Sequence, residues 1–294
     1  MRSLPLENYK AIFALKRGEL PAWRIAKCCL VLIWLPMISS VLLNYTTTSP
    51  TSGVCSWFPC QIFTYRWINI VFTCLTILFA FTYILNIRPA LSASVLAGFS
   101  FLIFSYQEAN GVYPRTATLS AIFLAQAVAY IFDPAKPSAP LLYSRQIIAA
   151  TYTLSGLSKL MAEGPAWFLQ GKYLLLQIKK GAYYWHFDNG GTAYLERQNN
   201  YVEYFSQHPF LMNAAMLIVM CAELTAGLML LSARMTLIYG LLLLGIHIGI
   251  RYFMDIIIEP IAFPMVILLI NPVYRIVQLG WWIDRKAGWN LFRR

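Results

Sequence analysis

Long apolar segments recur along the whole chain and are separated by short polar breaks. A helix needs about 20 mostly apolar residues to cross the hydrocarbon core of a bilayer. Eight segments reach or approach this length: 25–43, 67–87, 90–106, 116–132, 141–161, 210–231, 235–253 and 256–270. The pattern therefore predicts an all-α fold, a polytopic membrane bundle of about eight transmembrane helices that forms one integral membrane domain, residues 1–294.

The breaks between these segments differ in character. Residues 133–140 contain three prolines, which predict a rigid turn between two spans. Pro260 and Pro264 predict a broken last helix whose freed carbonyl groups need other partners. Residues 162–209 are rich in Tyr and Trp, which favour the headgroup level of a membrane. We expect this stretch to form an outer interfacial lid over the bundle, with a turn at 189–191.

Composition and charge agree with a membrane protein. Hydrophobic residues make up 59% of the chain and charged residues 12%, whereas about a quarter of an average soluble domain is charged. The net charge of +11 is spread along the chain, which argues against nucleic acid as a partner and for membrane lipids. More lysines and arginines fall inside if both termini are cytoplasmic. The N-terminus (1–24) and the basic aromatic tail (273–294) are therefore predicted to be cytoplasmic.

Two cysteines, Cys55 and Cys60, lie in the first predicted outer loop, residues 44–65. In an oxidising compartment a disulfide between them would close a small loop. The alternative is a pair of free thiols in a turn. No histidine lies beside them and their spacing fits no zinc pattern, so we predict no metal site.

An ionisable amine, Lys159, stands in an otherwise apolar and small-residue stretch, 151–171, that breaks at Gly164 and Pro165. An amine at such a depth is costly and is often functional. Lys159 either extends its ammonium to the headgroups at the outer end of a helix or is a partly desolvated base that acts near neutral pH. Position alone favours the first interpretation by a small margin.

Other polar residues of the spans have similar pairs of interpretations. Ser155 shares a helical face with Lys159, and Tyr152 lies one further turn back. Glu223, near the middle of its predicted segment, is either a buried hydrogen-bonding group or a proton acceptor or counter-ion for Lys159. His247 is a core histidine, a proton relay or a ligand, and its isolation argues against a metal.

Two blocks of the sequence resemble a known family. Tyr152, Gly156-Leu157-Ser158-Lys159-Leu160, Trp167 and Gly171 are similar to the aromatic, Gly-Leu-x-Lys-Leu, Trp, Gly pattern of the HTTM membrane proteins, which include the vitamin K-dependent gamma-glutamyl carboxylases. A second block resembles the family in the same order: Glu223-Leu224, Leu230-Leu231, Arg234, His247 and Phe263-Pro264. Together the blocks cover about the C-terminal half of the chain.

The resemblance implies a membrane enzyme that faces the periplasm, the extracellular side or an organelle lumen. Lys159 would be the base that deprotonates a quinol-like lipid, and Glu223 and His247 would tune it or relay protons. The cofactors would be a reduced, vitamin K-like quinone, O2 and CO2, and the partner an exported peptide. Residues 107–126 contain no histidine where the carboxylases have one, so the resemblance extends to the membrane core and its lysine. The substrate or lipid pocket would comprise Tyr152, Ser155, Gly156, Trp167, Gly171 and Arg251.

Two other classes of function compete with the enzyme. A non-catalytic maturation or scaffold partner of an exported protein would use the outer segment for binding, and Lys159 would only reach the headgroups. A transporter has weaker support, chiefly the Pro-broken last span. Replacing Lys159 by Arg separates a base from a structural cation, because arginine does not lose its proton in proteins.

Overall fold

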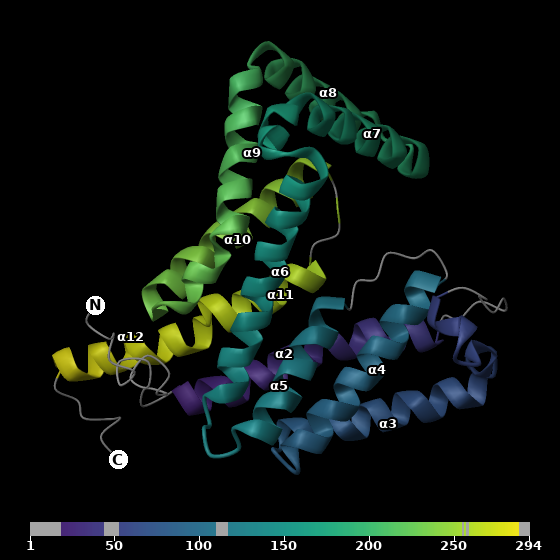
Figure 1. Ribbon diagram of the computed structural model, residues 1–294, viewed down its shortest axis with the longest axis vertical. Coiled ribbons are helices and arrows are strands. Elements are labelled where there is room, and N and C mark those ends of the chain that lie inside the picture. Colours follow the sequence, from purple (N-terminus) through teal and green to yellow (C-terminus); the bar gives the residue numbers. More distant parts are fainter. Residues whose placement is uncertain (1–18, 44–52, 110–116, 255, 257–258, 288–294) are drawn as a thin grey trace. The chain divides into compact units, whose positions relative to one another are not determined.

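The computed structural model describes residues 19–43, 53–109, 117–254, 256 and 259–287 (Figure 1). The regular elements of these residues are all helices. Among these described residues, four helices are long and apolar enough to cross a membrane, and a fifth span is counted if two helices bent by 96° act as one. The four are Arg66–Ile84, Pro89–Ala109, Ala233–Met254 and Ile261–Gly280. The described residues thus confirm the all-α class and contain several helices that could span a membrane, while the number of eight spans and the side of the termini stay predictions.

The predicted apolar segments correspond to helices with shifted ends. The third segment extends beyond residue 106 to Ala109, and the added turn includes buried Gln107. Residues 1–18 and 288–294 of the predicted cytoplasmic ends lie outside the described residues. The helices that correspond to the eight predicted segments, in chain order, are α2 (Glu19–Leu43), α3 (Arg66–Ile84), α4 (Pro89–Ala109), α5 (Ala117–Phe132), α6 (Ala139–Glu163), α9 (Pro209–Leu224), α10 (Ala233–Met254) and α11 (Glu259–Met265).

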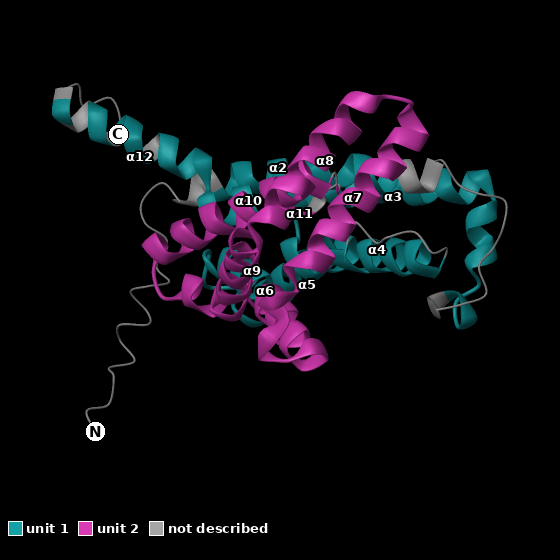
Figure 2. Cartoon of the chain, turned by 90° about the horizontal axis from the view of Figure 1, so that it is seen from above, with its two compact units in different colours: residues 1–148, 263–294 teal, residues 149–262 magenta. Residues whose placement is uncertain are grey.

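The chain divides into two compact units (Figure 2). Unit 1 comprises residues 1–148 and 263–294, and unit 2 comprises residues 149–262. The division falls within α6 and within α11, so each unit contains part of both helices. The integral membrane domain predicted over residues 1–294 is thus divided into two units, each described separately below.

The core of unit 1 forms around Trp34 of α2. Its indole Nε1 donates a hydrogen bond to the Ser100 hydroxyl of α4 at 2.6 Å, and its ring packs edge-on against Phe123 of α5 with 5.4 Å between centroids. Tyr83 of α3 contacts the same phenylalanine ring at 5.7 Å. Aromatic burial of this kind is a large hydrophobic contribution, and it joins four helices.

A buried polar chain crosses the same unit. The Tyr83 hydroxyl donates to Gln126 Oε1, and Gln126 Nε2 donates to the Ser144 hydroxyl at 2.8 Å. Lys27, only 1% exposed, donates to the Tyr83 carbonyl at 3.3 Å and to Asn86 Oδ1 at 3.0 Å. Polar side chains inside a membrane need such partners, because lipid supplies none. The chain therefore links α2, α3, α5 and α6.

The end of unit 1 has the break that its prolines predict. A π-helix, Val266–Ile270, follows α11, and Asn271 adopts a left-handed conformation with φ of 50°. Arg145 Nε donates to the Leu268 carbonyl at 2.9 Å, so the irregular backbone has a side-chain partner. Helix α12 (Pro272–Ala287) then begins, and it contains the described part of the predicted basic aromatic tail.

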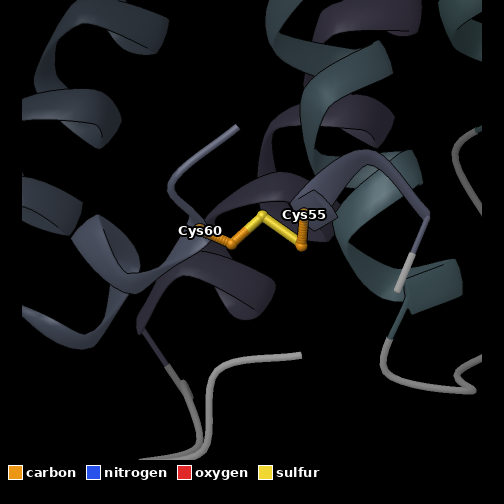
Figure 3. The surroundings of a disulfide bond; sticks show 2 residues. All are labelled: Cys55 and Cys60. Atoms are coloured by element: carbon orange, nitrogen blue, oxygen red, sulfur yellow. A yellow bond between two sulfur atoms is a disulfide. The ribbon is translucent and has the colours of Figure 1, made fainter. Parts of the chain in front are cut away.

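Cys55 and Cys60 form the expected disulfide (Figure 3). It joins two short 3-10 helices, η1 (Gly53–Ser56) and η2 (Cys60–Thr64), with 5.2 Å between the two Cα atoms. Buried Phe63 packs on Phe72 and Tyr106, both at 5.5 Å between centroids, and so fixes the loop on α3 and α4. The alternative of two free thiols is wrong.

Removing this disulfide will destabilise the protein modestly. Cys55→Ser with Cys60→Ser should lower the free energy of unfolding by about 2 kcal/mol, because the bond closes only a short loop in the unfolded chain. The change is measured by detergent denaturation. The control is Cys74→Ser with Cys221→Ser, which alters two exposed free cysteines and should change nothing; equal losses in both variants would contradict the assignment.

The link between α5 and α6 lies within the predicted turn, residues 133–140. Lys136 forms an ion pair with Asp133 at 2.6 Å, and the Tyr143 hydroxyl donates to the other oxygen of the same carboxylate at 2.8 Å. These hydrogen bonds, that from Lys136 first, lower the pKa of Asp133 below its ordinary value. The turn thus has its own internal bonds.

Unit 2 contains the predicted outer segment, residues 162–209, which consists of helices separated by short breaks. A 3-10 helix, η3 (Pro165–Gln170), leads into α7 (Gly171–Asn189) and α8 (Thr192–Gln207), which lie side by side (Figure 1). The expected turn is present: Gly190 is left-handed with φ of 72° and caps α7. Helices α9 and α10 complete the unit, joined by a 3-10 helix, η4 (Ala226–Leu230).

Candidate functional site

The end of α6 brings Lys159 into contact with the residues that follow it. Gly164 has φ of 75°, which a residue with a side chain rarely adopts, and Pro165 begins η3. The helix therefore stops at Glu163 and the chain turns. This turn places the Trp167 ring 4.9 Å from the Lys159 ammonium, close enough for a cation–π interaction.

Lys159 is paired with Glu223 of α9. The ammonium lies 2.5 Å from each oxygen of the carboxylate. The lysine side chain is 27% exposed and the glutamate side chain 10%, so both charges are largely removed from solvent. A charged Lys159 or Glu223 in this largely buried position would be costly without its partner. Contact with lipid headgroups alone does not account for the position of the Lys159 ammonium, because the ammonium contacts the Glu223 carboxylate.

The sequence predicts Glu223 near the middle of its apolar segment, but the structure places it near the end of a helix. Helix α9 ends at Leu224, one residue after it. The Thr225 hydroxyl donates to the Cys221 carbonyl and accepts a hydrogen bond from Tyr239 at 2.7 Å, and the 3-10 helix η4 begins at the next residue, Ala226. The carboxylate therefore belongs to the last turn of α9, and the predicted segment 210–231 is an α-helix followed by a 3-10 helix.

A second polar pair lies two helical turns before Lys159. The Tyr152 hydroxyl and His247 Nε2 of α10 are 2.5 Å apart. Tyr152 and Lys159 both belong to α6, and the four residues Tyr152, Lys159, Glu223 and His247 are here named the polar cluster. Within the described residues, the buried Nδ1 of His247 has no hydrogen-bond partner. The cluster thus contains an amine, a carboxylate, a phenol and an imidazole, from three helices.

Two glycines allow the helices of this cluster to approach one another. A Cβ on Gly156 would lie 3.1 Å from the Leu224 backbone nitrogen, next to Glu223. A Cβ on Gly171 would lie 2.5 Å from Asn213 Oδ1, which accepts a hydrogen bond from the Gly171 backbone at 3.2 Å. Both glycines of the predicted pocket therefore have packing roles, and no larger residue fits there unchanged.

Gly156→Val should destabilise the protein by about 1–3 kcal/mol, since overpacking forces neighbouring backbone apart. The measurement is the midpoint of detergent denaturation. Gly98→Val is the control: it places the same β-branched residue in an α-helix at a position where a Cβ would have nothing within 4 Å. A loss for Gly156→Val no larger than that of the control would contradict the close packing.

The structure does not bring every predicted pocket residue to Lys159. Ser155 is half-buried one turn before it. Arg251 instead lines a separate polar cavity of about 630 Å³ together with Lys180 and Asp188 of α7. Sequence reasoning missed this cavity and also missed Asn213. The available signals were Lys180, Tyr184 and Asp188, which recur every four residues on one helical face, and a lone amide in apolar α9.

The cluster contains groups that donate and accept protons. Among the residues that the structure describes, no group of three His, Cys, Asp or Glu side chains could hold a metal ion. A carboxylate and an amine in direct contact can exchange one proton without a change of net charge. A tyrosine and a histidine beside them can donate or accept others.

Comparisons with models of protein families, with curated proteins and with solved structures find no match to this chain. The likeness to the HTTM family therefore stays a prediction from the two sequence blocks.

Proposed function

We propose that this protein is an integral membrane enzyme, similar to the membrane core of the gamma-carboxylases, that removes a proton from a quinol-like lipid. The observation that carries the proposal is the contact of the Lys159 ammonium with both oxygens of Glu223 at 2.5 Å. An ammonium is not a base. The neutral amine that remains when its proton passes to the adjacent carboxylate is one.

The reaction then has two balanced steps. The Lys159 proton moves to Glu223, which gives a neutral amine and a carboxylic acid. The amine next takes the proton of a quinol hydroxyl, which gives a quinolate beside an ammonium. A substrate that displaces water favours the first step, because it makes the separated charges more costly. The quinolate is the form that O2 oxidises readily, and further coupling to CO2 and an exported peptide would follow the family.

Two features support a lipid substrate at the outer face. The Trp167 ring beside Lys159 offers an aromatic surface on which a quinol ring can stack. Disulfides persist in oxidising compartments, which supports an outer location for the loop of Cys55 and Cys60. In the proposed eight-span arrangement with cytoplasmic termini, the chain crosses the membrane through α3, α4, α5 and α6 after this loop. The end of α6 would then lie on the outer side too.

The activity itself is tested with the full chain in lipid nanodiscs. Reduced naphthoquinone with a vitamin K-like side chain is added, and oxygen uptake is recorded. The proposal expects uptake that rises in proportion to the amount of protein. A rate equal to that of empty nanodiscs would overturn it.

The alternative is a non-catalytic scaffold for an exported protein. One observation favours it: the Lys159 and Glu223 pair joins α6 to α9 beside the tight contact of Gly156 with Leu224. In that case the pair would be structural. The charge exchange Lys159→Glu with Glu223→Lys separates the two functions, because a scaffold keeps its fold and its binding, whereas the enzyme loses its ordered amine and its oxygen uptake.

A further inference from the structure

Unit 2 contains an apolar cavity of about 510 Å³ whose lining includes no residue of the polar cluster. Its walls come from α7, α8, α9 and α10, and none of the lining residues has a polar or charged side chain. Ile178 and Met212 are buried in its inner wall. Ile218 of α9 and Leu241 of α10 also line it but are 57% and 54% exposed, so the cavity reaches the surface of the unit.

Two glycines of α10 keep this cavity open. Gly245 and Gly249 are four residues apart, which places them on the same side of the helix, and both line the cavity. A Cβ at either glycine would have nothing within 4 Å. The space beside α10 is therefore not filled by the side chains of neighbouring helices.

The end of the cavity next to Met254 has fixed walls. The rings of Phe205 of α8 and Phe253 of α10 both line it and pack edge-on, with 5.9 Å between their centroids. Gln198, fully buried, donates to the Tyr252 carbonyl at 3.1 Å and so holds α8 on the end of α10. The cavity thus has a shape that packing and a hydrogen bond maintain.

The chemistry of the lining limits what can fill it. Apolar cavities that offer no hydrogen-bond partners exclude water and take apolar ligands. An extended peptide is excluded as well, because its backbone N–H and C=O groups would find no partners on these side chains. A hydrocarbon has no such groups and loses nothing in this cavity.

The dimensions then separate a hydrocarbon chain from a transmembrane helix. Along α10 the lining extends from Leu241 to Met254, which at 1.5 Å per residue is a length of about 20 Å. The volume of 510 Å³ divided by this length gives a mean cross-section of about 25 Å². A helix with its side chains is about 10 Å wide and has a cross-section of roughly 80 Å². The cavity is therefore too narrow to enclose a helix, whether from a second copy or from another protein.

We propose that this cavity binds one acyl chain of a membrane phospholipid, which lies along α10. Helix α10 is one of the helices long and apolar enough to span a membrane, so as a span it would hold the cavity at the depth where acyl chains lie. Since the lining has no charged side chain, the site selects the chain and not the headgroup. The proposal does not depend on the chemistry of Lys159.

The site is tested by native mass spectrometry of the full chain, released from phosphatidylcholine nanodiscs. The wild type should retain one phosphatidylcholine more than Gly249→Leu, whose new side chain enters the open space beside α10. Gly98→Leu, at an equally open position of α4, is the matched control and should retain as much lipid as the wild type. Leucine has a higher helix propensity than glycine, so both variants should fold, and their denaturation midpoints check this.

Two further arms identify the source of the chain. Phosphatidylglycerol with the same acyl chains should show the same difference between the wild type and Gly249→Leu. An equal amount of the vitamin K-like naphthoquinone should not displace the bound phospholipid. Equal retention in the wild type and Gly249→Leu, an equal loss in Gly98→Leu, a difference seen with only one headgroup, or displacement by the naphthoquinone would each overturn the proposal.

Discussion

Lys159→Ala should lower the rate of quinol-dependent oxygen uptake by about 10²- to 10⁴-fold, which is the usual contribution of a general base. The substitution removes the only group of the cluster that becomes a neutral amine by giving its proton to Glu223. The rate is measured in nanodiscs, on protein that elutes as one peak in size exclusion.

Lys172→Ala is the matched control for this loss. Its ammonium lies 5.0 Å from the Tyr173 ring, as that of Lys159 lies 4.9 Å from Trp167, but Lys172 is exposed on α7. Oxygen uptake should not change in this variant. An undiminished rate in Lys159→Ala, or the same loss in both variants, would contradict the assignment of Lys159 as the base.

Glu223→Ala should lower the free energy of unfolding by about 3 kcal/mol. The change leaves the Lys159 ammonium, 27% exposed, without its counter-ion, and breaking a buried ion pair in this way is strongly destabilising. The double variant Lys159→Met with Glu223→Leu should recover most of the loss, because it removes both charges and keeps apolar volume. Detergent denaturation of the single and double variants measures the coupling.

An exposed ion pair provides the comparison. Lys136 and Asp133 lie 2.6 Å apart, but the lysine side chain is 67% exposed. Lys136→Ala should therefore leave the denaturation midpoint within error of the wild type. If Glu223→Ala is as mild as Lys136→Ala, then the Lys159 charge is solvated and the pair is not buried in the way described.

The periodicity of apolar residues was sufficient to predict the helices, but not where each one ends. The pattern of residues 210–231 predicts one continuous helix, whereas α9 ends at Leu224 and Thr225 bonds to Cys221 and to Tyr239. Glu223 thus lies in the last turn of α9, although it is near the middle of the predicted segment. The α-helix is followed there by the 3-10 helix Ala226–Leu230, a change that the spacing of apolar residues does not distinguish.

The components of the candidate site were visible in the sequence, but their grouping was not. Lys159 and Glu223 stood out as charges in apolar segments, and the structure places them in contact although 64 residues separate them. Arg251, assigned to the same pocket, lines another cavity instead. The buried Lys27 and its link to Tyr83 were also missed, because their partners come from separate helices.

The most direct test of the central claim is the rate of oxygen uptake by Lys159→Arg. A guanidinium keeps the ion pair with Glu223 but does not lose its proton near neutral pH. If Lys159 is a base, this variant will fold with a denaturation midpoint close to that of the wild type and will be as inactive as Lys159→Ala. A folded Lys159→Arg protein with the wild-type rate would contradict the claim and leave Lys159 a structural cation.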